Sequence, residues 1–283
     1  MSSRVTLFSV AAAAAFLLSA CSTPTTGPAP VQGPPSSGGS TAVTFNPPSI
    51  DSVPNDENGK AIKLGYDLMN DTKKLLPNNV GNQLSCSSCH AQAGTVEKEL
   101  SLVGVASVYP QYRDREAAVS TLEDRVNQCL QRSMNGKPIP YDSTEMRAFS
   151  MYMSYISKGI PEGTNPPWRG QNVKIDVSNP NLQEGQKLYQ QSCAACHGAN
   201  GEGTPAGPAV WGPNSFNDGA GMANLSKMAA FVKVNMPKAP MGGENPGALT
   251  DAQARDVSAW ILSHDRPHFP GKSKDFPKGR PQN

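Results

Sequence analysis

The pentapeptide Cys-x-x-Cys-His occurs twice in this chain of 283 residues. It is the attachment motif of c-type haem. Two thiols three positions apart can meet the two vinyl groups of one porphyrin, and the adjacent histidine then directs its imidazole at the iron. We therefore predict two covalently bound haem c groups. The predicted attachment residues are Cys86, Cys89, Cys193 and Cys196, and the predicted proximal iron ligands are His90 and His197.

Two other kinds of site share the Cys-x-x-Cys core of this motif, namely a thioredoxin-like redox pair and half of a zinc site. A redox pair does not require a following histidine, and both copies have one. A zinc site requires two further ligands at suitable spacing. The presence of two complete copies in one chain favours haem.

The N-terminus has the pattern of a targeting segment. Val5 to Leu18 is apolar but too short to span a bilayer stably. The following Leu18-Ser19-Ala20-Cys21 resembles a bacterial lipobox, which predicts cleavage before Cys21 and lipidation of that residue. We therefore expect an exported protein on the periplasmic side, anchored to a membrane by lipid. Ordinary signal cleavage near this position is the alternative.

The rest of the chain contains one unit twice. Each copy has an amphipathic segment, the Cys-x-x-Cys-His motif, a loop-rich stretch and a closing helix. Strand signals are nearly absent, so the predicted fold is all-α, with two tandem cytochrome c-type domains that each surround one haem. The predicted ranges are 1–20 for the signal peptide, 21–50 for a Pro/Gly/Ser-rich tether, 51–165 for the first domain, 166–180 for a linker, 181–268 for the second domain and 269–283 for a C-terminal tail.

The closing helices have recognisable first turns. Thr250-Asp251-Ala252-Gln253 is a capping box, and Asp142-Ser143-Thr144-Glu145 is a looser version of one. Each predicted helix carries an aromatic residue near its end, Tyr155 in the first and Trp260 in the second. The two halves therefore look alike at their C-terminal helices as well.

The second half resembles an ordinary cytochrome c domain. Pro208 stands where such domains place a carbonyl that accepts a hydrogen bond from the proximal histidine, whereas the first half has no proline at that offset. Asn235-Met236-Pro237 resembles a Met-Pro ligand loop, so Met236 is the predicted sixth ligand of the second iron. Met228 and Met241 are the alternatives.

Cys129 occupies the corresponding position of the first half. Met236 lies 39 residues after His197, and the residue 39 positions after His90 is Cys129. It is also the only one of six cysteines without a haem or lipid assignment. Its predicted helix has an apolar stripe, so we expect an inward-facing thiolate that ligates the first iron. A buried inert thiol and an intermolecular disulfide are the alternatives.

Six stretches of the chain, within about residues 55 to 278, resemble the dihaem thiosulfate dehydrogenases. The stretch around Cys129 is the most specific, because haem motifs alone occur in many cytochromes. Some members place a lysine next to the second ligand, whereas Asn235 precedes Met236 here. The six stretches are Val80–Asn82, Leu84–His90, Arg125–Gly136, Glu145–Met153, Asn235–Pro237 and His264–Pro267.

The resemblance implies a reaction and a division of labour between the haems. Two thiosulfate ions are oxidised to tetrathionate, and two electrons pass to a soluble or membrane-bound cytochrome acceptor. The active-site haem would have His90 and Cys129 as its ligands, and the electron-exit haem would have His197 and Met236. The physiological direction is left open, because tetrathionate reduction would use the same site.

Arginines near Cys129 suit an anionic substrate, because the planar guanidinium fork binds multi-oxygen anions well. Arg125 and Arg132 share the predicted helix face of Cys129, and Arg113 precedes that helix. We predict Arg113 and Arg125 as substrate contacts. The alternative is a solvated face on which arginines pair with their acidic neighbours, Glu123 and Asp124.

Two other functions compete with this enzyme. A dihaem electron carrier would have no chemistry of its own, but thiolate ligation suits a high-potential shuttle poorly. A haem subunit of a sulfur-oxidising multienzyme complex also uses a cysteine-ligated haem, and would need a tightly bound partner subunit. The net charge of +2 gives no reason to expect nucleic-acid binding.

Overall fold

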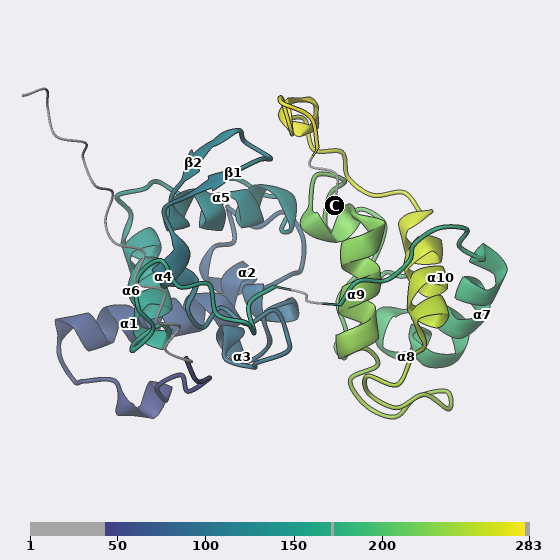
Figure 1. Ribbon diagram of the computed structural model, residues 1–283, viewed down its shortest axis with the longest axis horizontal. Coiled ribbons are helices and arrows are strands. Elements are labelled where there is room, and N and C mark those ends of the chain that lie inside the picture. The colour runs from purple at the N-terminus through teal and green to yellow at the C-terminus, as the bar shows by residue number, and fades with distance from the viewer. Residues whose placement is uncertain (1–42, 171–172, 281–283) are drawn as a thin grey trace, which may run out of the picture. The chain divides into compact units, whose positions relative to one another are not determined.

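The computed structural model describes residues 43–170 and 173–280 (Figure 1). The predicted signal peptide, Cys21 and most of the predicted tether lie outside the described residues. Within the described part of the chain, no helix combines the length and the apolar character needed to cross a membrane.

The first haem unit is built from short and medium helices and one small hairpin. Its strands β1 (Gln111–Arg113) and β2 (Ala118–Ser120) pair antiparallel, with Gln111 opposite Ser120. Its helices are η1 (Ile50–Ser52), α1 (Glu57–Asn70), α2 (Thr72–Leu75), η2 (Cys86–Ser88), α3 (Ala91–Gly94), α4 (Val105–Val108), α5 (Leu122–Arg132) and α6 (Thr144–Ile156).

The second haem unit follows α6 in the chain, and its described residues form helices joined by loops, with two isolated β-bridges and no strand (Figure 1). The all-α prediction is therefore confirmed, apart from the one two-stranded hairpin in the first unit. The helices of the second unit and of the C-terminal segment are α7 (Leu182–Ser192), α8 (Ala194–His197), η3 (Gly221–Ala223), α9 (Leu225–Asn235), α10 (Asp251–Leu262) and η4 (Lys272–Lys274).

The predicted helix starts are also found. In α10, the Thr250 hydroxyl accepts from the Gln253 amide at 3.2 Å, and the Gln253 side chain accepts from the Thr250 amide at 2.7 Å. In α6, the cap is Ser143, whose hydroxyl accepts from the Met146 amide at 3.1 Å. These bonds satisfy backbone donors that a helix leaves free at its first turn.

A glycine brings the leading and closing helices of the first unit close together, where α1 crosses α6. A methyl group added at Gly65 would lie 2.2 Å from the Ala148 carbonyl oxygen and 2.5 Å from the Tyr152 Cβ. Only a residue without a side chain allows this approach of two backbones.

The second unit repeats this crossing where α7 meets α10. A methyl group added at Gly185 would lie 2.1 Å from the Asp256 carbonyl oxygen and 3.0 Å from the Trp260 Cβ. The matching contacts make Tyr152 the counterpart of Trp260. Tyr155, the aromatic residue expected near the end of α6, lies one helical turn beyond Tyr152 and donates to the Ser49 carbonyl.

The folded body of the first unit extends beyond the predicted range 51–165 at both ends. The ring of Phe45 packs edge-on against Trp168, with 5.3 Å between centroids. The Trp168 indole donates to the Val103 carbonyl at 2.9 Å, and the Tyr155 hydroxyl donates to the Ser49 carbonyl at 2.7 Å. The last residues of the predicted tether and the first residues of the predicted linker therefore belong to this unit.

The predicted C-terminal tail also packs into the fold. The carboxylate of Asp275 forms ion pairs with Arg132 at 2.6 Å and with Arg115 at 3.2 Å. The Phe276 amide donates to the Arg115 carbonyl at 2.8 Å. Residues 269–280 thus return to the hairpin and to α5 of the first unit, and we call them the C-terminal strap.

Candidate functional site

The first haem motif is held against the first residue of α2, Thr72, which is fully buried. Its hydroxyl accepts from the Cys86 amide at 3.0 Å and donates to the Cys86 sulfur at 3.4 Å. Desolvation raises the pKa of the Cys86 thiol to about 12 and that of Cys89 to about 11. Both groups are therefore neutral thiols in the polypeptide.

His90 has a partner that the sequence did not reveal. Its Nδ1 lies 2.6 Å from the carbonyl oxygen of Leu100. Desolvation is the main reason why the pKa of His90 falls to about 4, so the imidazole is neutral near pH 7. A neutral ring that donates from Nδ1 to a carbonyl leaves Nε2 free to ligate a metal.

The carbonyl of Leu100 reaches His90 through a local backbone feature. Leu100 has φ +50°, in the left-handed region, within the loop between α3 and α4. The first unit therefore orients its proximal histidine without a proline. A backbone carbonyl of an ordinary leucine carries no sequence signal, which explains why this contact was missed.

Cys129 lies on α5 and faces the first haem motif. The guanidinium Nη1 of Arg125 donates to the Cys129 sulfur at 2.9 Å. Cys129 is also close enough to Cys86 and Cys89 to raise the pKa of each, after the larger effect of desolvation. The structure thus brings together the residues predicted for the first site, and iron ligation by Cys129 stays a prediction.

Arg125 keeps its charge in this position. Cys129 is the main reason why the pKa of Arg125 is raised, and desolvation opposes it. Its acidic neighbours have other partners, because Ser150 donates to Glu123 at 2.7 Å and Tyr141 donates to Asp124 at 2.5 Å. The alternative of a salt-bridged arginine face is therefore not formed at Arg125.

Arg113 belongs to the same group of charges. Its Nη1 donates to the Tyr109 hydroxyl at 3.0 Å, and its Nε lies 3.3 Å from a Glu116 carboxylate oxygen. The side chain of Arg113 is 26% exposed, which leaves the guanidinium accessible to an anion from solution.

Arg169 is a third arginine of this site, and sequence reasoning missed it because it lies in the predicted linker. Desolvation lowers its pKa, and Tyr109, Arg125 and Arg113 are the charged or titratable groups that act on it. Its Nε is buried without a hydrogen-bond partner. Three arginines thus gather around Tyr109 beside Cys129.

Arg132, which shares the predicted helix face of Cys129, does not join this group. Its guanidinium is held by the Asp275 carboxylate and lies over the Phe269 ring, 4.2 Å from the centroid. Its side chain is only 12% exposed. Arg132 therefore anchors the C-terminal strap.

The second haem motif lines a cavity of about 310 Å³ whose other lining residues are mostly apolar. Cys193, Cys196, His197 and Met236 all contribute to its wall. Met228 and Met241, the two alternative ligands, line it as well, so the choice of Met236 stays a prediction. The His197 Nδ1 lies 2.8 Å from the Pro208 carbonyl oxygen, which confirms the predicted contact.

The donor sets and the cavity fit haem c. Each site has two thiols and one histidine whose Nδ1 is held by a carbonyl, and the second has an apolar cavity with a methionine on its wall. Leu84, Ser88 and Cys89 of the first unit line that same cavity. One attachment residue of the first haem, Cys89, therefore borders the same cavity as both attachment residues of the second.

Two family models match the chain, one in each unit. The model described as SoxA/TsdA, cytochrome c domain, matches residues 77–161. The model described as Cytochrome c matches residues 182–265. The first match includes the Cys86 motif and Cys129, and the second includes the Cys193 motif and Met236.

The chain is also similar to several named proteins. It is 40% identical to thiosulfate dehydrogenase of Psychrobacter arcticus over 83% of this chain and 72% of that one. It is 36% identical to thiosulfate dehydrogenase of Allochromatium vinosum over 80% of this chain and 86% of that one.

Among solved structures, the thiosulfate dehydrogenase TsdBA of Marichromatium purpuratum matches with a TM-score of 0.74 and 32% identity, over 80% of this chain and 50% of that chain. This chain thus spans about half the length of the TsdBA chain. Together with the two haem sites, these likenesses show that the chain belongs to the thiosulfate dehydrogenase family of dihaem c-type cytochromes.

Proposed function

We propose that this protein oxidises two thiosulfate ions to one tetrathionate ion and carries out the sulfur chemistry at Cys129. The observation that carries this proposal is the contact between Arg125 and the Cys129 sulfur beside the first haem motif. A sulfur that only packs does not need a charged donor at 2.9 Å. A fixed cation beside it attracts anionic substrates.

Cys129 acts as a nucleophile on sulfur. Its thiolate forms a bond to the sulfane sulfur of the first thiosulfate, with loss of two electrons. The sulfane sulfur of a second thiosulfate then attacks that bonded sulfur, which releases tetrathionate and restores the Cys129 thiolate. No proton is gained or lost in either step, so the site requires cations and no general base.

Bound haem supplies the one-electron acceptors that this sulfur chemistry requires. The chain's own residues set the direction of electron flow. An anionic thiolate at Cys129 favours the oxidised state of the first centre, whereas a thioether at Met236 raises the potential of the second. Cys89, an attachment residue of the first haem, lines the cavity of the second, so the two centres lie close together.

The arginine group holds the substrate. Arg125, Arg113 and Arg169 surround Tyr109, and a sulfonate carries three oxygens that can each accept from a guanidinium. The electron-carrier alternative gives no role to this group of cations. The multienzyme alternative requires a separate cytochrome partner, whereas a cytochrome c domain lies within this chain at residues 182–265.

Turnover by the purified chain alone tests the proposal. The protein with both haems attached is incubated without oxygen with thiosulfate and an artificial one-electron acceptor, and tetrathionate is measured by ion chromatography. We expect one tetrathionate for every two thiosulfates consumed and two acceptors reduced. Absence of turnover in fully haem-loaded protein would favour the carrier or the multienzyme subunit instead.

We also propose that the mature protein is a lipoprotein on the periplasmic side of a membrane, with a cytochrome as its electron acceptor. The support is the lipobox pattern that ends at Cys21, which lies outside the described residues. Mass spectrometry of the mature N-terminus checks it. An acylated Cys21 is expected, and an unmodified N-terminus downstream of Cys21 would indicate ordinary signal cleavage.

A further inference from the structure

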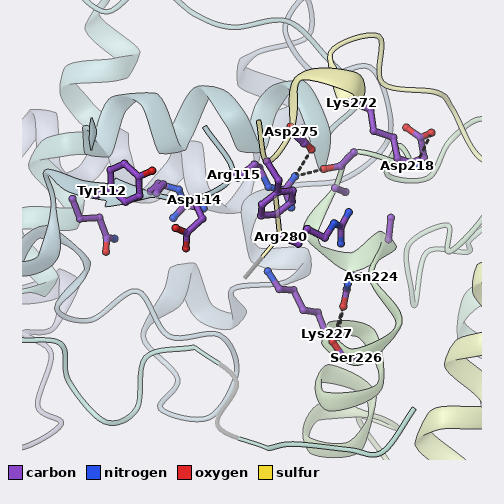
Figure 2. A pocket seen from close by; sticks show the side chains of 16 residues that line it. Tyr112, Asp114, Arg115, Asp218, Asn224, Ser226, Lys227, Lys272, Asp275 and Arg280 are labelled. Carbon is purple, nitrogen blue, oxygen red and sulfur yellow. Dashed lines mark hydrogen bonds and ion pairs between the residues drawn. The ribbon is translucent and has the colours of Figure 1, made fainter. Parts of the chain in front are cut away.

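A pocket of about 430 Å³ lies beside the arginine group of the first unit (Figure 2). Its walls come from three parts of the chain that are distant in sequence. These are the β1–β2 hairpin, the segment that leads into α9, and the C-terminal strap. Of its lining residues, only Arg113 has a part in the reaction described so far.

The pocket has an excess of positive charge. Five cationic side chains and three acidic ones line it. Two of the acids already have partners, because Asp275 pairs with Arg115 and Arg132, and Asp218 pairs with Lys272 at 3.1 Å. The cations that line the pocket therefore outnumber the acids that can neutralise them, which makes the pocket attractive to an anion.

Lys227 lines this pocket and is affected by the charges of the arginine group beside Cys129. It lies in the first turn of α9, lines the pocket and keeps contact with solvent. Its pKa is lowered by partial desolvation first, and then by the charges of Arg115, Arg125 and Arg113. The last two belong to the arginine group beside Cys129, and Arg113 also lines the pocket, so an anion at Lys227 would lie within the electrostatic field of that group.

The stoichiometry of the reaction requires two anion sites. Two dianions must come together at one cysteine, and their mutual repulsion grows as they approach. The product carries a sulfonate at each end of a chain of four sulfurs. The arginine group can hold one sulfonate, and the other needs a second set of cations, which the pocket offers next to Arg113.

We propose that this pocket binds the second thiosulfate, and the far sulfonate of tetrathionate, with Lys227 of the second haem unit as its main cation. This inference rests on the proposed function. From the pocket, the second thiosulfate directs its sulfane sulfur at the sulfur bonded to Cys129. A sulfur–sulfur bond forms within tetrathionate as the bond to Cys129 breaks, the electron pair returns to the Cys129 thiolate, and no oxidant is needed.

The exchange step can be measured without an electron acceptor, because it runs backwards from tetrathionate. The Cys129 thiolate attacks tetrathionate, forms the Cys129–thiosulfate adduct and releases one thiosulfate. Intact-protein mass spectrometry of the haem-loaded protein follows this adduct with time. Steady-state thiosulfate oxidation by the same preparations gives KM and kcat.

Lys227→Gln is the test variant, and Lys187→Gln is the matched control, because Lys187 is an exposed lysine of α7 in an ion pair with Glu184. We expect Lys227→Gln to raise KM at least tenfold and to slow adduct formation from dilute tetrathionate at least tenfold. Lys227→Arg should keep both the KM and the rate of adduct formation close to those of the unmodified protein. The control should match the unmodified protein.

The outcomes separate the two proposals. Unmodified protein that forms no tetrathionate from thiosulfate would contradict the proposed function. Active unmodified protein together with unchanged KM and adduct formation in Lys227→Gln would contradict the second anion site alone. If Lys227→Gln loses its haem spectra through misfolding, Arg280→Gln on the strap tests the same pocket, with the same expected direction.

Discussion

The two haem units share a scaffold and differ in what they place at the open side of the haem. Both have the helix crossing at a glycine, Gly65 in one and Gly185 in the other. In the first unit the residue 39 positions after the proximal histidine is Cys129, with Arg125 against its sulfur. In the second it is Met236, in a largely apolar cavity. Under the proposed function, one scaffold thus serves catalysis or electron transfer according to one side chain and the charge beside it.

The units also differ in how they hold the proximal histidine. His197 uses the carbonyl of Pro208, and His90 uses the carbonyl of Leu100. The distance from Nδ1 to oxygen is similar, at 2.8 Å and 2.6 Å. The proximal histidine therefore requires a backbone carbonyl within hydrogen-bond distance of its Nδ1, and different residue types can provide that carbonyl.

Removal of the cysteine should have the largest effect. Cys129→Gly should keep the fold and both haems but lose thiosulfate oxidation by 10³-fold or more, which corresponds to about 4 kcal/mol of transition-state stabilisation. The reason is that no sulfur remains to bond to the substrate. Turnover with thiosulfate and an artificial acceptor measures it.

Two substitutions sharpen this result. Cys129→Met offers the first iron a thioether, and it should not restore activity, because a thioether cannot form and break the sulfur–sulfur bond. Met236→Gly is the matched change in the second unit. It should remove the methionine signature from one haem spectrum while thiosulfate still reacts at Cys129. Substantial turnover in either Cys129 variant would mean that both units are electron carriers.

Loss of the charge beside the cysteine should have the next largest effect. Arg125→Gln should lower kcat/KM for thiosulfate by about 10- to 100-fold, since a hydrogen bond to a charged group contributes roughly 1.5–3 kcal/mol. Arg147→Gln, an exposed arginine on α6, is the control and should leave the kinetics unchanged. Equal kinetics for both variants would remove Arg125 from the site.

The shared scaffold can be tested at its glycines. Gly185→Ala should lower the free energy of unfolding by about 1–3 kcal/mol, because the added methyl group meets the Asp256 carbonyl and forces α7 away from α10. Gly65→Ala should do the same in the first unit. Chemical denaturation of the haem-loaded protein measures it. Gly221→Ala is the control, because a methyl group there meets nothing within 4 Å.

The smallest effect should come from the ion pair that joins the two units at the surface. Lys238, two residues after Met236, pairs with Glu99, the residue before Leu100. The side chains are 51% and 28% exposed, so water screens the pair and its contribution should be about 0–1 kcal/mol. A double-mutant cycle with Glu99→Gln and Lys238→Gln measures the coupling. A larger value would indicate that the pair links the two haem sites.

The sequence predicted the parts of the fold and site that depend on residue type. The two haem motifs, the Pro208 carbonyl and the cap at Thr250 are all visible as patterns. The 39-residue spacing also led to Cys129, and the structure brings that residue to the first haem motif beside Arg125. These predictions worked because each chemical role requires a particular side chain at a particular spacing.

Features that depend on long-range packing could not be predicted in this way. Leu100 contributes only a backbone carbonyl, and Arg169 reaches the site from a segment that looked like a linker. Arg132 shares the helix face of Cys129, but a carboxylate 143 residues later holds it. Helical periodicity gives the direction of a side chain and cannot show which distant segment meets it there.

The C-terminal strap has a consequence for how the molecule is made. A chain that is synthesised from its N-terminus presents the first haem unit long before residue 275 exists. During that interval Arg132 and Arg115 lack the carboxylate that later holds them, and the side of the first unit that the strap covers stays open. The strap can pack against the first unit only after the whole second unit has been synthesised. A stop codon before position 275 would therefore leave the first unit without these ion pairs, although it lies in the part of the gene that follows the second.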